Sequence, residues 1–196
     1  MIERKEYLQR LYDWKDEQVI KVVTGIRRCG KSTLLKQYQE KLLQSGILPE
    51  QIISINFEDL EYEELLDYKA LYRYIKERLC EGKMTYIFLD EIQKVDSFEK
   101  AVDSIYIKDM TDIYITGSNA YMLSGDLATL LTGRYVEISM LPFSFRDYYA
   151  LTAPELSPDA AFADYMRYGG FPYLSTMKKD TGKRLRSIWR VFIIPL

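Results

Sequence analysis

Residues 25–32 read Gly25-Ile-Arg-Arg-Cys-Gly-Lys31-Ser32 and match GxxxxGK[ST], the pattern of a phosphate-binding loop. A β-branched run precedes this segment at 19–24, and apolar residues at helical spacing follow it over 31–43. In a strand, loop and helix of this order, backbone N–H groups and the positive end of the helix surround an anionic phosphate. A fortuitous glycine-rich turn is the alternative. We predict a nucleotide-phosphate site formed by Gly25, Ile26, Arg27, Arg28, Cys29, Gly30, Lys31, Ser32 and Thr33.

Two side chains of this segment carry specific chemistry. Lys31 supplies a positive charge for the β- and γ-phosphates, so we count it among the catalytic residues. Ser32 offers a hydroxyl to Mg²⁺, which prefers oxygen ligands in octahedral geometry. The segment therefore predicts binding of ATP together with Mg²⁺.

The rest of the chain alternates apolar runs of strand length with longer amphipathic stretches. This alternation predicts an α/β fold with a five-stranded, largely parallel sheet flanked by helices. After the first strand at 19–24, further strands are expected at 52–57, 85–89, 113–116 and 135–140. Further helices are expected at 68–79, 97–106 and 121–131. Beyond Pro142 only helix-like segments follow.

Two carboxylates, Asp90 and Glu91, come directly after the buried strand at 85–89. Ligands of open α/β sheets bind at the carboxyl ends of the strands. We expect Asp90 to hold Mg²⁺ and Glu91 to orient and deprotonate the water that attacks the γ-phosphate. A turn capped by Asp90 is the alternative. After a phosphate loop, the pair indicates a Walker B motif.

A polar segment, Thr116-Gly-Ser118-Asn119, follows the next strand. Asn119 is our third catalytic candidate, with Ser118 as second choice, because an amide there can hydrogen-bond the attacking water or the γ-phosphate. An ordinary Ser/Asn turn explains the same residues.

Composition narrows the chemistry further. The 196 residues suffice for one α/β domain with a small appendage. Histidine is absent, so any general base must be another side chain. The net charge of −2 gives no electrostatic footprint for nucleic acid. The N-terminus lacks the apolar core of a signal peptide, and no apolar run reaches membrane-spanning length. We expect a cytoplasmic protein without a membrane partner, and the sequence does not support a nucleic-acid partner.

These segments resemble the prokaryotic AAA_14 type of AAA+-like ATPases, within the ASCE division of P-loop proteins. The family pattern reads VITGxRRxGKST, hhhhDEIQ, GSS/GSN, LTGR, LPxSFxE and GGFP. The corresponding segments here are 22–33, 87–93, 117–119, 131–134, 141–147 and 169–172. Asp147 stands where the family commonly has Glu, and Cys29 fills a variable position. The resemblance covers most of the chain and implies an ATP hydrolase with strand order 5-1-4-3-2.

The resemblance also adds residues that the pattern of the chain does not select. It makes Arg134 a candidate arginine finger or sensor, with self-association through Arg134 as one consequence. A salt bridge at a turn is the alternative for Arg134. Arg4 and Tyr7 stand where related ATPases close over adenine, although a charged helix start explains them equally well. No protein partner follows from the sequence.

By the same resemblance, residues 1–141 form the ATPase core and residues 142–186 begin a small helical lid. Related chains continue well beyond this length, commonly with a segment like YLEGIYNTV. Permitted codons for residues 187–196 encode that segment in another reading frame. We expect a frameshifted tail at 187–196 that leaves out the family's C-terminal domain. A short homologue with a divergent apolar tail is the alternative.

Three other functions fit parts of the sequence. Residues 93–96, Gln-Lys-Val-Asp, superficially resemble a guanine-reading [NT]KxD segment, but they follow Glu91 too closely for a GTPase. A small-molecule kinase would use the region after Pro142 to bind a phosphoryl acceptor. A nucleotide-switched binding module would turn over little ATP. The Asp90-Glu91 pair and Asn119 favour water as the acceptor.

Overall fold

The computed structural model describes residues 2–117, 131, 133–153 and 155–172. These residues belong to two compact units. One unit contains Glu3–Arg27 and Lys31–Met140, and the other contains Leu141–Leu196 together with Met1–Ile2 and Arg28–Gly30. Each unit is described by itself.

The first unit is built on a five-stranded sheet in which every neighbouring pair is parallel. The strands are β1 (Ile20–Gly25), β2 (Ile52–Asn56), β3 (Thr85–Asp90), β4 (Thr111–Thr116) and β5 (Tyr135–Met140). Their order is β2-β3-β4-β1-β5. This is the predicted order 5-1-4-3-2 read from the other edge, so the prediction is confirmed. The register brings the carboxyl ends of β1, β3 and β4 to the same end of the sheet.

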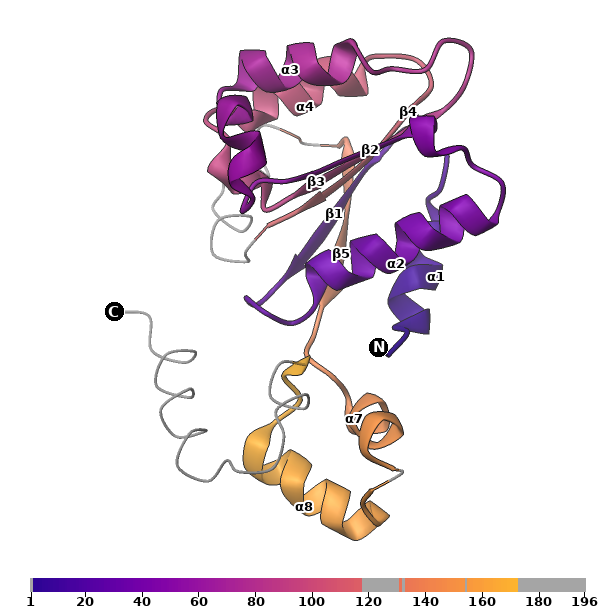
Figure 1. Ribbon diagram of the computed structural model, residues 1–196, viewed down its shortest axis with the longest axis vertical. Helices are drawn as coiled ribbons and strands as arrows, with labels where there is room; N and C mark the ends of the chain where they lie inside the picture. The colour runs from indigo at the N-terminus through magenta and orange to yellow at the C-terminus, as the bar shows by residue number, and fades with distance from the viewer. Residues whose placement is uncertain (1, 118–130, 132, 154, 173–196) are drawn as a thin grey trace. The chain divides into compact units, whose positions relative to one another are not determined.

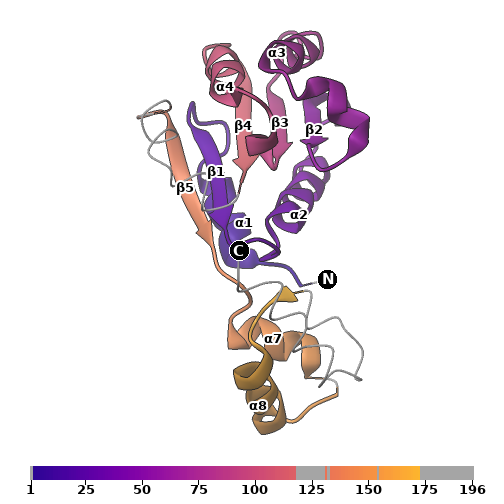
Figure 2. The same ribbon diagram turned by 90° about the vertical axis from the view of Figure 1, so that its left-hand side faces the viewer.

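Helices cover both faces of this sheet, as Figures 1 and 2 show. On one face lie α1 (Lys5–Asp13) and α2 (Lys31–Gln44), and on the other lie α3 (Tyr68–Lys76) and α4 (Phe98–Tyr106). Short 3₁₀ helices occupy Pro49–Gln51 (η1), Leu60–Leu65 (η2) and Ile92–Lys94 (η3). Among the described residues, no helix is both long enough and apolar enough to cross a bilayer.

The two faces of the sheet have different cores. Aliphatic side chains at alternate strand positions, such as Val22, Ile87 and Ile115, pack against α3 and α4. The face toward α2 is aromatic: the rings of Phe88 and Tyr114 stack with centroids 4.8 Å apart, and the Tyr38 ring packs against both. The period-2 alternation of a strand therefore assigns each side chain of β3 and β4 to one of two chemically distinct layers.

Most element boundaries agree with the sequence to within two residues. β4 begins at Thr111 rather than at residue 113, because Thr111 and Asp112 also pair with β3. α3 ends at Lys76, three residues before the predicted end. The helix expected at 121–131 falls almost entirely outside the described residues.

The second unit contains α7 (Phe145–Thr152) and α8 (Pro158–Tyr168), in the stretch where helical segments were expected. Ser144 and Asp147 form a capping box at the start of α7, which explains a short acidic residue at position 147. A Cβ at Gly170 would lie 2.0 Å from the carbonyl oxygen of Phe143, so only glycine fits there. The lid at 142–186 and the frameshifted tail at 187–196 stay predictions, and residues 173–196 lie outside the described part.

Candidate functional site

The loop between β1 and α2 contains three residues with positive φ angles. Gly25 and Gly30 have φ angles of 152° and 107°, and Arg28 has a φ of 66°. Glycine adopts such angles without a Cβ clash. The loop ends at Lys31, the first residue of α2. The N–H groups in the first turn of this helix, which have no acceptor within the helix, therefore adjoin the loop. The predicted residues 25–33 therefore form one continuous strand, loop and helix start.

The ammonium group of Lys31 bends back over its own loop. Lys31 Nζ donates to the carbonyl oxygens of Gly25 at 3.1 Å and Ile26 at 3.4 Å. Its third neighbour is Oε1 of Glu91, 3.8 Å away, which is too far for a hydrogen bond. Lys31 is only 4% exposed, and both of its hydrogen bonds within the described residues go to neutral carbonyl oxygens.

Asp90 is the buried carboxylate of the site. It ends β3 and accepts hydrogen bonds from the side chains of Thr116, at 2.5 Å, and Ser32. Burial raises the pKa of Asp90, and the hydrogen bonds from Ser32 and Thr116 partly oppose this effect. The Asp90 charge is therefore only partly compensated by the protein.

Glu91 lies in a left-handed turn with a φ of 56°, a strained conformation for a residue with a side chain. Its backbone N–H donates to the Thr116 hydroxyl at 2.9 Å. Its carboxylate accepts from Nε2 of Gln93 at 2.5 Å and faces Lys31. The turn thus directs the Glu91 side chain to the loop lysine.

Two residues that contact this pair of carboxylates did not emerge from the sequence as site residues. The Thr116 hydroxyl donates to Asp90 and accepts from the backbone of Glu91, so it joins β4 to both. Gln93 holds Glu91. Thr116 is identified by the parallel register of the structure, in which Leu89 pairs with Ile115 and the next residues of both strands are therefore neighbours.

Arg27 does not join this cluster. Its guanidinium is exposed and lies 3.7 Å from the carboxylate of Glu58. Ser118 and Asn119 lie outside the described residues.

Arg134 lies at the other end of the sheet. It comes just before β5, and its carbonyl oxygen accepts from the backbone N–H of Ile20 at the start of β1. At about 3.3 Å per residue, the length of β1 separates this position from Gly25 by roughly 16 Å. The guanidinium donates to Asp103 at 2.8 Å and lies 5.6 Å from the centre of the Tyr106 ring. The structure does not bring Arg134 to Lys31, Asp90 or Glu91 of its own chain.

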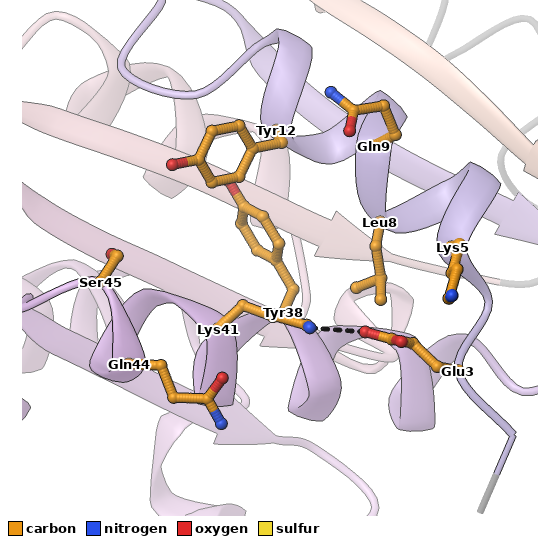
Figure 3. A pocket seen from close by; sticks show the side chains of 9 residues that line it. All are labelled: Glu3, Lys5, Leu8, Gln9, Tyr12, Tyr38, Lys41, Gln44 and Ser45. Atoms are coloured by element: carbon orange, nitrogen blue, oxygen red, sulfur yellow. Dashed lines mark ion pairs between the residues drawn. The ribbon is translucent and has the colours of Figure 1, made fainter.

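A groove of about 620 Å³ lies between α1 and α2. Figure 3 shows its apolar floor, Leu8, Tyr12 and Tyr38, and the 2.6 Å ion pair between Lys41 and Glu3 at its rim. Arg4 and Tyr7 are not among its lining residues; the Arg4 guanidinium lies 4.7 Å from the centre of the Tyr7 ring. The groove contains none of the predicted phosphate, metal or catalytic residues.

The donor set at the strand ends fits Mg²⁺ better than a transition metal. No group of three or more acidic or cysteine side chains within the described residues could hold a metal alone. Ser32 and Asp90 are hydrogen-bonded neighbours and offer one hydroxyl and one carboxylate. Mg²⁺ commonly takes one or two protein ligands and completes its shell with phosphates and water.

Comparison with known proteins adds family information to this geometry. The AAA_14 family model, described as an AAA domain, matches residues 17–149. An uncharacterized protein of Haemophilus influenzae is 45% identical over 176 residues, which cover 88% of this chain and 44% of the relative. One from Methanocaldococcus jannaschii is 29% identical over 177 residues, covering 84% of this chain and 38% of the relative. The chain thus spans less than half the length of these relatives.

Solved structures share the fold at low sequence identity. A Walker-type ATPase of Pyrococcus abyssi has a TM-score of 0.54 and 20% identity, over 89% of this chain and 65% of that one. The ORC1 protein of Aeropyrum pernix, solved in complex with DNA, has a TM-score of 0.53 and 13% identity, over 79% of this chain and 49% of that one. Both likenesses concern the fold alone.

Proposed function

The chain belongs to the AAA_14 family of AAA domains, and on that premise we propose that it binds ATP with Mg²⁺ and hydrolyses it. The observation that carries the proposal is the meeting of Lys31, Asp90 and Glu91 at one edge of the sheet, beside the start of α2. A cation for phosphate, a buried oxygen ligand for a metal and a carboxylate base then lie in one site.

Binding is assigned to the loop and to the first turn of α2. Backbone N–H groups of residues 25–33 receive the phosphates, and Lys31 exchanges its two carbonyl partners for phosphate oxygens. Ser32 and Asp90 would hold Mg²⁺, which supplies charge neutralisation on the β- and γ-phosphates when bound. The hydrogen bond between Ser32 and Asp90 supports this assignment, because it shows that the two proposed metal ligands are neighbours.

Hydrolysis is assigned to Glu91. Its carboxylate takes a proton from the water whose oxygen attacks the γ-phosphorus. As the new P–O bond forms, the bond from the γ-phosphorus to the bridging oxygen breaks, and its electron pair leaves with ADP. Asn119 is assigned a hydrogen bond to the attacking water or to the γ-phosphate.

Steady-state phosphate release tests this assignment. Glu91→Gln is expected to keep ATP binding and to lose about 100-fold or more in turnover, since a positioned base typically contributes that much. Glu137→Gln, the same isosteric change on β5, is the control and should hydrolyse ATP at the wild-type rate. Equal hydrolysis by wild type and Glu91→Gln would remove Glu91 from its role. ADP formation that requires an added acceptor and releases no free phosphate would identify a kinase, and tight binding with no turnover would identify a nucleotide switch.

We also propose that Arg134 acts on ATP bound by a second copy of the chain. Its distance from Lys31 within one chain and its half-exposed side chain support action in trans. Specific activity should then rise with protein concentration, and Arg134→Ala mixed with Glu91→Gln should recover some turnover. Flat specific activity across a wide dilution series, with no recovery on mixing, would contradict it.

A further inference from the structure

We propose that Gln93 is the positioning residue of the catalytic base, so that its amide holds Glu91 ready to accept a proton. This inference rests on the ATPase function proposed above. Its first support is the 2.5 Å hydrogen bond from Gln93 Nε2 to Glu91 Oε2. This is a short contact for an amide donor, and it involves an ionised acceptor.

The backbone conformation between Glu91 and Gln93 allows this contact. In a regular helix, residues two apart do not face each other. Here the left-handed φ of 56° at Glu91 turns the chain directly into η3. Ile92 is fully buried and Val95 is 2% exposed, so both anchor η3 in the core on either side of Gln93. The left-handed turn and the two buried side chains therefore place the Gln93 amide beside Glu91.

The contact settles which way the Glu91 carboxylate points. Lys31 Nζ is 3.8 Å from Oε1, and a carboxylate free to rotate would close on this ammonium as a salt bridge. In such a pair the carboxylate would face Lys31 rather than an attacking water. Gln93 instead holds the other oxygen, Oε2, through its amide, and so fixes the orientation of the carboxylate.

The carbonyl oxygen of the Gln93 amide bears on whether the residue serves only to stabilise the fold. Gln93 Oε1 is buried and accepts no hydrogen bond from the described residues. A buried acceptor without a partner costs free energy, so a side chain kept only for stability would be better replaced by an apolar one. Among the described residues, the one hydrogen-bond partner of the Gln93 amide is therefore Glu91.

This reasoning separates activity from stability in one substitution. Gln93→Met has a similar length, removes the unsatisfied acceptor and deletes the donor to Glu91. We expect its thermal stability to equal or exceed that of the wild type, its KM for ATP to stay unchanged and its kcat to fall about tenfold. Gln93→Asn keeps the amide on a shorter stem and should recover part of the lost kcat.

Gln51→Met is the matched control. Gln51 also lies in a short 3₁₀ helix, but both ends of its amide are paired, with the carbonyl oxygen of Met84 at 2.8 Å and the backbone N–H of Leu48 at 3.2 Å. It should lose stability and keep the wild-type kcat. The two substitutions therefore have opposite expected outcomes.

A double-mutant cycle with Glu91→Gln decides the matter. If Gln93 acts only through Glu91, adding Gln93→Met to Glu91→Gln should lower turnover no further. A second tenfold loss in that background, or a wild-type kcat in Gln93→Met alone, would overturn the role of Gln93 while leaving the ATPase intact. No hydrolysis by the wild type, or equal hydrolysis by Glu91→Gln, would overturn the ATPase proposal and the role of Gln93 with it.

Discussion

Two buried lysines lie at opposite ends of the sheet, and each faces a carboxylate. At the amino end, Lys21 Nζ of β1 lies 2.5 Å from Asp112 Oδ1 of β4, and both side chains are fully buried. The other oxygen of Asp112 accepts from the backbone N–H of Asp16 and from the Tyr114 hydroxyl, both at 2.9 Å. At the carboxyl end, Lys31 and Glu91 stay 3.8 Å apart.

The difference lies in how completely each group is paired. The Lys21 ammonium has Asp112 and the carbonyl oxygen of Glu17 as close partners, which leaves little for a ligand to improve. Within the part of the chain that the structure describes, Lys31 has two hydrogen-bond acceptors, both of them carbonyl oxygens of its own loop. The lysine–carboxylate pair is thus closed by a direct hydrogen bond at the amino end of the sheet and left open at the carboxyl end. An open pair is what a phosphate can enter.

Burial opposes the charges at the closed end. It lowers the pKa of Lys21 and raises the pKa of Asp112, so desolvation outweighs the mutual attraction of the pair. Such a pair adds little net stability, but each partner becomes costly to remove alone.

The largest expected effect therefore comes from breaking the closed pair. Lys21→Ala should lower the free energy of unfolding by about 3–5 kcal/mol, because it leaves Asp112 buried and uncompensated. Lys31→Ala should lower it by only about 1 kcal/mol, since Glu91 retains its hydrogen bond from Gln93. Urea unfolding without nucleotide measures both. Equal losses would mean that the two ends are not differently built.

Asp90→Asn tests the carboxyl end of the sheet at its proposed metal ligand. The pKa of Asp90 is raised, so its charge costs stability at neutral pH, and removing the charge should increase the free energy of unfolding. This gain should shrink as the pH falls through the raised pKa toward the ordinary Asp range, because the wild-type carboxyl becomes neutral there. Nucleotide affinity should no longer depend on Mg²⁺. A destabilised Asp90→Asn protein, or a gain that grows in acid, would contradict this account.

Two threonines of β4 give the smallest contrast. Thr116→Val removes the hydroxyl that joins Asp90 to the backbone of Glu91, and turnover should fall about tenfold with ATP still bound. Thr111→Val removes a hydroxyl at the other end of the same strand, which donates to the carbonyl oxygens of Ile105 and Lys108. It should leave turnover unchanged. The assignment of Thr116 fails if both variants hydrolyse ATP at the wild-type rate.

The sequence predicted the strands of the sheet and the phosphate-loop motif at its carboxyl end, because those features depend on local patterns. β-branched runs give strands, and Gly25, Gly30 and Lys31 form a motif within one short segment. The closed end depends on contacts between residues about 90 positions apart in the chain. Lys21 within a β-branched strand gives no local sign that Asp112 will lie beside it.

Two features of the site itself were also beyond local patterns. Thr116 was read as the start of a polar turn, and only its register with β3 places its hydroxyl on Asp90. Gln93 lies two residues after Glu91, a spacing that brings side chains together only because Glu91 adopts a left-handed φ. Side-chain contacts that depend on strand register or on a strained backbone conformation cannot be predicted from the spacing of residues in the sequence.

The most direct test of the open end is the shift in melting temperature that Mg²⁺-ATP causes in the wild type and in Lys31→Ala. Ligand at about 100 times its Kd stabilises a protein by roughly 2.7 kcal/mol, so the wild type should melt several degrees higher with Mg²⁺-ATP than without it. Lys31→Ala should show little or no shift under the same conditions. An equal shift in both proteins would contradict the claim that the open pair at the carboxyl end of the sheet binds the nucleotide.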